Sequence, residues 1–191
     1  SMATALETGI FAYDDVYDCQ HYFTEIPGTQ LKDWTLDKDV APSGMLTLQE
    51  GLMRSCNPWF YRIGMELYRQ NRTNDLSNMA RAFGLGSLTG IEGVSEEPGN
   101  IPNPTDELDN ARIAIGQSQV LVNPLQVARF VAAVGNGGTL YRPQVIEKIT
   151  DPDGNASFTF EPEAQSTLPV KPENLALIQE AMRWVVSSSR G

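Results

Sequence analysis

The sequence has 191 residues, of which 41% are hydrophobic, and this is an ordinary share for a globular protein. Its formal net charge is −10 and its 14 basic residues are scattered singly, so no cationic patch suits a phosphate backbone and nucleic-acid binding is not expected. No stretch approaches the roughly 18 apolar residues that a membrane span needs, so the chain is expected to be soluble.

The first 45 residues mix aromatic side chains with turn formers and show no sustained helical periodicity, which predicts loops and short extended pieces. Ser1 and Met2 are interpreted as a cloning remnant. Cys19, Cys56 and the single His21 do not complete a four-ligand zinc site, so no metal and no cofactor are predicted. One disulfide is an alternative, but two free buried thiols are the preferred interpretation.

Helical signals begin at Thr47, where Thr47 and Glu50 match a capping box and predict a short helix over 48–54. A second helix is expected to start at Pro58 with Asn57 as its cap. Its core-facing residues recur at helical spacing and are Trp59, Phe60, Ile63 and Leu67.

Further helices are expected over 75–83, ending at Gly84, and from Asn123-Pro124 to about Gly135. Between them, residues 84–105 are rich in Gly and Pro and predict a long irregular connection.

The remaining sequence predicts a hairpin and a helix. Residues 141–150 and 155–160 are expected to be two strands about the turn at 151–154. A final amphipathic helix should begin near Pro172 and carry one apolar stripe, formed by Leu175, Ile178, Met182 and Val185.

MRSCNPWFYRIG, residues 53–64, places Ser55, Cys56 and Asn57 between two apolar runs. Because a residue before proline is pushed toward extended dihedrals, Asn57 is expected in an extended turn. Alternate residues of extended backbone project to one side, so Ser55 and Asn57 should point together and Cys56 toward the core. A hydroxyl that passes a proton, beside a carboxamide that orients an amide, suits one wall of an acyl-transfer site. The alternative is that both residues are only helix caps.

LQEGLMRSCNPWFYRIG resembles the region around the Ser-x-Asn motif of penicillin-binding proteins, the transpeptidases that cross-link bacterial peptidoglycan. ALETG is similar to the end of the helix that carries the nucleophile in that family. AFGLGSLTGIEGVSEEPGNIP and IGQSQVLVNPLQVARFVAAVGNGGTLYRPQVI resemble its Gly-rich segment and the loop, helix and first sheet strand that follow. These matches keep the family order over most of residues 3–150 and indicate the monofunctional class B branch, of the elongation type similar to penicillin-binding protein 2.

The resemblance implies a role for each residue of the trio. Ser55 would be the catalytic hydroxyl that relays a proton, and Cys56 a packing residue. Asn57 would be the substrate-binding side chain that holds the amide of a peptidoglycan stem peptide or a β-lactam. The parent protein is expected at the bacterial cytoplasmic membrane, with this domain on the extracytoplasmic side and cell-wall synthesis proteins as partners.

Two motifs of the family are missing from the sequence. The reaction needs a serine followed three residues later by a lysine, and a Lys-Thr-Gly strand. The lysines of the chain are Lys32, Lys38, Lys148 and Lys171, and neither motif occurs at any of them. The parent family forms an acyl-enzyme as a serine-type D,D-transpeptidase, but this chain alone is expected to be inactive, so whether it is itself an enzyme is left open.

The expected fold is α+β, the mainly helical part of a penicillin-binding or β-lactamase-like transpeptidase fold, with its antiparallel sheet reduced to one two-stranded hairpin. Residues 3–191 are interpreted as a partial transpeptidase domain, with a mostly helical lobe over 3–138 and the hairpin plus C-terminal helix over 139–191. A lone hairpin is marginal in water, so it should lean on that helix or expose an edge that favours self-association. Two other functions stay open, a β-lactam sensor domain of the same superfamily and a non-catalytic scaffold or interaction module.

Overall fold

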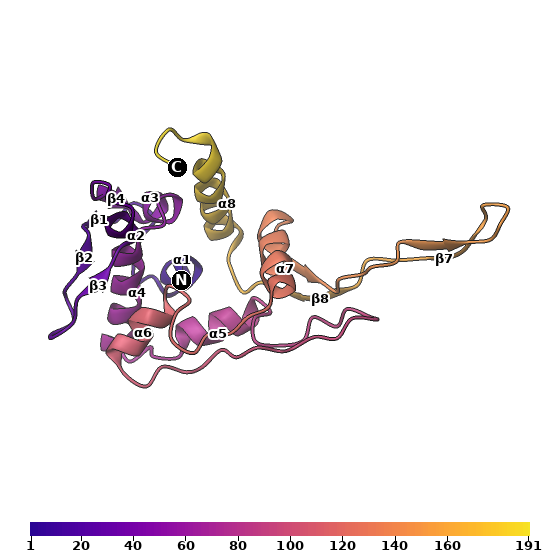
Figure 1. Cartoon of the computed structure of the whole chain (residues 1–191), viewed down its shortest axis with the longest axis horizontal. Coiled ribbons are helices and arrows are strands. Elements are labelled where there is room, and N and C mark those ends of the chain that lie inside the picture. The colour runs from indigo at the N-terminus through magenta and orange to yellow at the C-terminus, as the bar shows by residue number, and fades with distance from the viewer.

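The computed structural model describes residues 1–191 and has the expected α+β architecture (Figure 1). The helices are α1 (Met2–Thr8), α2 (Trp34–Asp37), α3 (Leu48–Met53), α4 (Asn57–Arg69), α5 (Asp75–Ala82), α6 (Glu107–Ile113), α7 (Pro124–Gly135) and α8 (Pro172–Ser187). The strands are β1 (Val16–Cys19), β2 (Tyr22–Phe23), β3 (Leu31–Lys32), β4 (Gly44–Thr47), β5 (Thr139–Tyr141), β6 (Lys148–Thr150), β7 (Ala156–Thr159) and β8 (Ala164–Thr167). They pair as four antiparallel two-stranded sheets, β1–β4, β2–β3, β5–β8 and β6–β7.

Helix α4 is central to the helical body, and its buried face accounts for its sequence. Trp59, Ile63 and Leu67 are fully buried, as the helical spacing predicts. Gly64 lies where α4 meets α6, and a Cβ at this position would be only 2.5 Å from the backbone oxygen of Asn110. The Asn110 carboxamide donates to the Gly64 carbonyl at 2.8 Å. A glycine in mid-helix therefore lets the two helix backbones approach closely.

Most of the helix ends expected from the sequence are confirmed. Thr47 and Glu50 form the reciprocal capping box at the start of α3, and Asn123 caps α7 through its side chain. Gly84 follows α5 with a φ of +81°, in the left-handed region that favours glycine. These signals are local in sequence, and for that reason they can be interpreted before the fold is known.

The first 45 residues contain more regular structure than predicted. Strand β1 pairs with β4 over four residues, and β2 pairs with β3 over two. Helix α1 spans seven residues, of which Met2, Ala3, Thr4 and Ala5 are buried, and its end at Thr8 confirms the helix end that the resemblance of ALETG implied. A helix this short and this buried has no polar face that would reveal its period, and strands of two to four residues depend on their partners.

Residues 139–167 form a β-arm that projects from the helical body (Figure 1). The expected hairpin about residues 151–154 is confirmed as β6–β7. Its first strand is shorter than the predicted 141–150, because Tyr141 belongs to β5, which pairs with β8 at the base of the arm. All residues of β6 and β7 are exposed. The hairpin was predicted either to pack against the C-terminal helix or to expose its edges, and in the structure its edges are exposed. Arg142 forms ion pairs with Glu92 and Glu163 at the base of the arm.

Helix α8 contacts α1, α3 and α7. Leu175 and Ile178 of its predicted stripe are buried and Met182 is half-buried, but Val185 is 45% exposed. The buried stripe thus ends about one turn before the predicted position. None of the helices combines the length and the apolar character that crossing a bilayer requires.

Candidate functional site

Ser55 lies in the turn between α3 and α4, with a left-handed backbone at φ +54°. Its N–H donates to the Leu52 carbonyl at 3.1 Å, and the Cys56 N–H donates to the Gly51 carbonyl at 3.0 Å. These two bonds are those of a Schellman motif, in which the residue at the Ser55 position is usually glycine. The predicted extended conformation is therefore wrong for Ser55, because the end of α3 determines its backbone.

Asn57 is the first residue of α4, and the prediction that it caps this helix is wrong. The N-cap is Cys56, whose backbone is extended and whose Sγ accepts a hydrogen bond from the Trp59 N–H at 3.4 Å. The bias of a pre-proline residue against helical dihedrals is overcome here by a tertiary contact. The Asn57 N–H donates to Oδ1 of Asp33 at 2.9 Å, which holds the residue at the helix start.

The two predicted site residues differ in their surroundings. Ser55 is exposed, and its hydroxyl makes no hydrogen bond within the chain. Asn57 is half-buried, and its Nδ2 donates to the Lys32 carbonyl at 3.4 Å. One amide hydrogen and Oδ1 of Asn57 therefore have no partner within the chain, and a bound amide has matching groups for both. The buried Cys56 between them points into the core, as predicted.

Cys19 and Cys56 form a disulfide, which corrects the preferred interpretation of two free thiols. Both residues are fully buried, and their Cα atoms are 6.3 Å apart. Cys19 ends β1, which packs against α4, so the fold brings two cysteines that are 37 residues apart into bonding range. The disulfide ties the middle residue of the corner to the β1–β4 sheet. It also uses both sulfurs of a cluster in which Asp33 is the third potential ligand.

Asp33 was not selected from the sequence, although it lies under the corner and is only 1% exposed. Its Oδ2 accepts from the Thr35 N–H at 3.2 Å and from the Thr35 hydroxyl at 2.6 Å, and so caps α2. The only sequence signal for it is an aspartate two residues before a threonine, a common start of a helix. Tyr61 donates its hydroxyl to the Lys32 carbonyl at 3.4 Å, and burial followed by the charge of Asp33 raises the pKa of Tyr61.

Trp34 and Arg54 fix the end of α3, directly before the corner at residues 55–57. The Trp34 indole donates to the Arg54 carbonyl at 3.1 Å, and the Arg54 guanidinium lies 5.5 Å from the centre of the Trp34 ring. The carbonyl belongs to the last turn of α3, where backbone oxygens have no partner within the helix. The indole supplies that partner and joins α2 to the end of α3.

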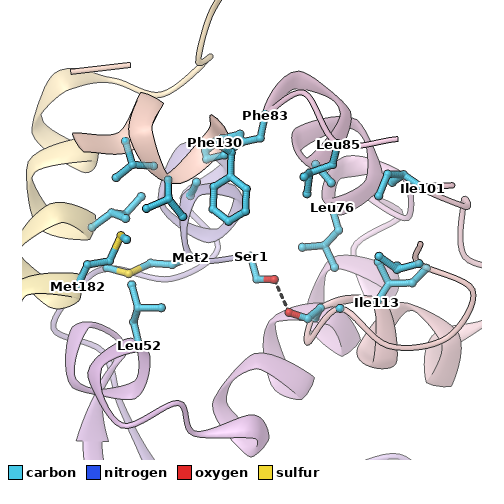
Figure 2. Close-up of a pocket in the computed structure, with 18 residues that line it drawn as sticks. Ser1, Met2, Leu52, Leu76, Phe83, Leu85, Ile101, Ile113, Phe130 and Met182 are labelled. Carbon is cyan, nitrogen blue, oxygen red and sulfur yellow. Dashed lines mark hydrogen bonds between the residues drawn. The ribbon is translucent and has the colours of Figure 1, made fainter. Parts of the chain in front are cut away.

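An apolar cavity of about 470 Å³ lies elsewhere in the body, between α1, α5, α7 and α8 (Figure 2). Figure 2 shows Phe83, Phe130, Leu76 and Met182 among its walls, and a hydrogen bond from the Ser1 hydroxyl to the Ala114 carbonyl. Neither Ser55 nor Asn57 lines it. The cavity offers packing surface and no set of convergent polar groups, so the candidate site is the corner at residues 55–57.

Comparison with known proteins gives consistent matches. Residues 1–191 match the family model of the penicillin-binding protein transpeptidase domain. The chain is 32% identical to peptidoglycan D,D-transpeptidase PbpA of Mycobacterium tuberculosis, covering 74% of this chain and 28% of that protein. Among solved structures, the ceftriaxone acyl-enzyme complex of penicillin-binding protein A from M. tuberculosis has a TM-score of 0.73 at 27% identity, covering 95% of this chain and 39% of that one. A peptidoglycan synthase complex that coordinates polymerization and crosslinking has a TM-score of 0.80 at 27% identity, covering 98% and 31%.

The chain belongs to the penicillin-binding protein transpeptidase family, in its class B branch. This confirms the resemblance inferred from the Ser-x-Asn region and the Gly-rich segment. The chain spans about a quarter to a third of the length of the curated relatives that it matches. The roles of Ser55 and Asn57 are not tested by these matches and stay predictions.

Proposed function

We propose that this chain forms the Ser-x-Asn wall of a peptidoglycan D,D-transpeptidase active site. Ser55 relays a proton, and Asn57 holds the amide of the stem peptide or of a β-lactam. The observation that carries the proposal is the Ser55 hydroxyl, which is exposed and without a partner on a corner held by a disulfide and a buried carboxylate. Family membership supports the reaction class.

The chemistry of acyl transfer suits these two side chains. Attack on the carbonyl carbon of an amide requires that the amide be held in one orientation and that the leaving nitrogen receive a proton. The free Oδ1 and the second amide hydrogen of Asn57 complement the N–H and C=O of a peptide bond. The Ser55 hydroxyl both accepts and donates a proton, and a positioned acid or base of this kind contributes about 10²- to 10⁴-fold in rate.

The chain alone should not form an acyl-enzyme, because its sequence has no serine three residues before a lysine. Incubation of this chain with a fluorescent penicillin, followed by denaturing electrophoresis, should give no covalently labelled band. The whole protein that carries the segment is the positive control and should be labelled. Labelling of the isolated chain would refute this part of the proposal.

The whole protein is proposed to act on the extracytoplasmic side of the bacterial membrane, together with cell-wall synthesis proteins. The support is membership of the transpeptidase family and the structural match to a peptidoglycan synthase complex that coordinates polymerization and crosslinking. Fractionation of cells that express the tagged protein should recover it with the membrane, and protease added outside the cytoplasm should cleave this segment.

The β-arm is proposed to make the isolated chain self-associate. The cross-strand pair Ile149 and Phe158 is half exposed, and both outer edges of β6–β7 have unpaired backbone groups. Light scattering after size-exclusion chromatography should show association that rises with concentration and is lost in the double variant Ile149→Thr, Phe158→Thr. Val186→Thr on α8 is a matched exposed control. A strict monomer at high concentration would contradict the proposal.

A non-catalytic scaffold is the second candidate, and one observation favours it. Ser55 terminates α3 and Asn57 begins α4, so both have structural places in the chain. The substitutions Ser55→Ala and Asn57→Ala in the whole protein separate the two functions. Unchanged acylation by β-lactam in both variants would favour the scaffold, and loss of acylation favours the transpeptidase wall.

A further inference from the structure

The Asp33 carboxylate contacts two helices with its two oxygens. Oδ2 accepts both bonds from Thr35 and caps α2, whereas Oδ1 accepts only from the Asn57 N–H, at 2.9 Å. Capping of α2 is therefore complete without Oδ1. The second oxygen is free to act on α4, which is the helix that begins with the proposed substrate-binding residue.

The start of α4 needs such an acceptor. The first N–H groups of a helix have no partner inside it. Pro58 has no N–H, and Trp59 donates to the weak acceptor Sγ of Cys56. The Asn57 N–H thus donates to the Asp33 carboxylate, which is the only charged acceptor at this end of a 13-residue helix. Bonds to a carboxylate are the stronger kind, and a negative charge at the N-terminal end also complements the helix dipole.

Asn57 is held at a second point by the residue next to Asp33. The carbonyl of Lys32 accepts from the Asn57 carboxamide at 3.4 Å, so residues 32 and 33 bind both the backbone and the side chain of Asn57. The Asp33 N–H in turn donates to the His21 carbonyl at 2.8 Å, which ties this strand end to the β2 side of the sheet. A shift of Asp33 would move both contacts of Asn57 together.

We infer that Asp33 is a positioning residue, which sets the place of Asn57 in the active-site wall by holding its backbone N–H. The inference rests on the proposed function, because it assigns Asp33 a role in acyl transfer through Asn57. Asp33 itself is buried and does not touch substrate. Small displacements of a positioning group reduce rates strongly, and a shift of about 1 Å can cost about 100-fold.

The test uses Asp33→Ser, with Thr35→Val as the matched control. A serine has one side-chain oxygen and is itself a good N-cap, so it retains the start of α2 and loses the reach to Asn57. Thr35→Val removes the hydroxyl bond to Oδ2 and leaves Oδ1 untouched. We expect Asp33→Ser to speed amide hydrogen exchange at Asn57 in this chain by about 10-fold or more, measured by NMR, and Thr35→Val to leave it unchanged.

In the whole protein, Asp33→Ser should lower the acylation rate constant for a β-lactam by about 10- to 100-fold. Thr35→Val should leave this rate constant unchanged, even if it lowers the Tm as much as Asp33→Ser does. If amide hydrogen exchange at Asn57 is unchanged in Asp33→Ser, the inference is overturned, whether or not Asn57 binds substrate. Faster exchange with normal acylation, when Asn57→Ala is impaired, would overturn the inference and leave the proposed function standing. Normal acylation in both Asp33→Ser and Asn57→Ala would refute the proposed function and the positioning role with it.

Discussion

Replacing Ser55 with glycine separates the backbone of the corner from its chemistry. Ser55 has a φ of +54°, and its N–H and that of Cys56 close the Schellman motif at the end of α3. Glycine is the residue that this motif favours, so Ser55→Gly retains the turn and removes the Cβ together with the hydroxyl. Alanine removes the same hydroxyl but keeps a Cβ in the left-handed region, and so serves as the matched variant.

The magnitude follows from two opposing terms. A non-glycine residue in the left-handed region is less favourable by about 1–2 kcal/mol. Glycine loses more chain entropy on folding, which offsets about 0.5–1 kcal/mol of that gain. Because the Ser55 hydroxyl has no hydrogen-bond partner in the chain, nothing else is lost. Ser55→Gly should therefore be as stable as the wild type or more stable by about 1 kcal/mol, equivalent to a rise in Tm of about 2–4 °C.

The assay pairs this stability measurement with acylation in the whole protein. Thermal unfolding of the isolated chain should place Ser55→Gly at or above the wild type and Ser55→Ala close to it. Acylation by a fluorescent penicillin should fall by about 10²- to 10⁴-fold in both variants. A destabilised Ser55→Gly chain would show that the corner is not left-handed, and normal acylation in both variants would show that Ser55 relays no proton.

Three further predictions concern stability. Reduction of the Cys19–Cys56 disulfide, which closes a 37-residue separation, should lower the free energy of unfolding by about 4 kcal/mol in the chain-entropy model; an equal Tm with and without reductant would contradict it. Gly64→Ala puts a Cβ 2.5 Å from a backbone oxygen of α6, so it should cost about 1–3 kcal/mol, whereas Gly135→Ala meets nothing within 4 Å and is the control for denaturant unfolding. Burial raises the pKa values of Tyr61 and Tyr17 above the ordinary 10.0, so both phenols keep their protons longer in the folded chain. Stability is then complete below pH 10 and falls as the pH rises beyond it; phenolate absorbance titrating near pH 10 for every tyrosine of the folded chain would refute this.

The helix starts show what the sequence alone can predict. The capping box at Thr47 and Glu50 and the cap at Asn123 depend on residues three positions apart, so a single sequence displays them fully. The buried face of α4 follows from the helical period in the same way. The end of α1 was predicted only through the family resemblance of ALETG, because its buried residues show no helical period. Of the four strand pairs only the β6–β7 hairpin was predicted, and β1–β4 and β5–β8 were missed because they join residues more than 20 positions apart.

The corner itself could be predicted only in part, because its conformation depends on distant residues. The rule for pre-proline residues favoured an extended Asn57, but Asp33, 24 residues earlier, holds its N–H at the start of α4. The spacing of Cys19 and Cys56 contains no sign that β1 brings them together. The local motif predicts the candidate site residues, and their geometry depends on contacts that only the fold supplies.

The conformation of Ser55 bears on why the chain has a serine there. Three restraints meet within residues 54–57, namely the Trp34 bond to the Arg54 carbonyl, the Cys56 disulfide and the Asp33 bond to Asn57. Together they hold a backbone geometry that glycine would adopt with less strain. If the turn alone mattered, glycine would serve it better. The hydroxyl is all that serine adds, and it is exposed and unused within the chain. A strained residue whose only gain is a free hydroxyl supports the proposed role of Ser55 in a preorganised active-site wall.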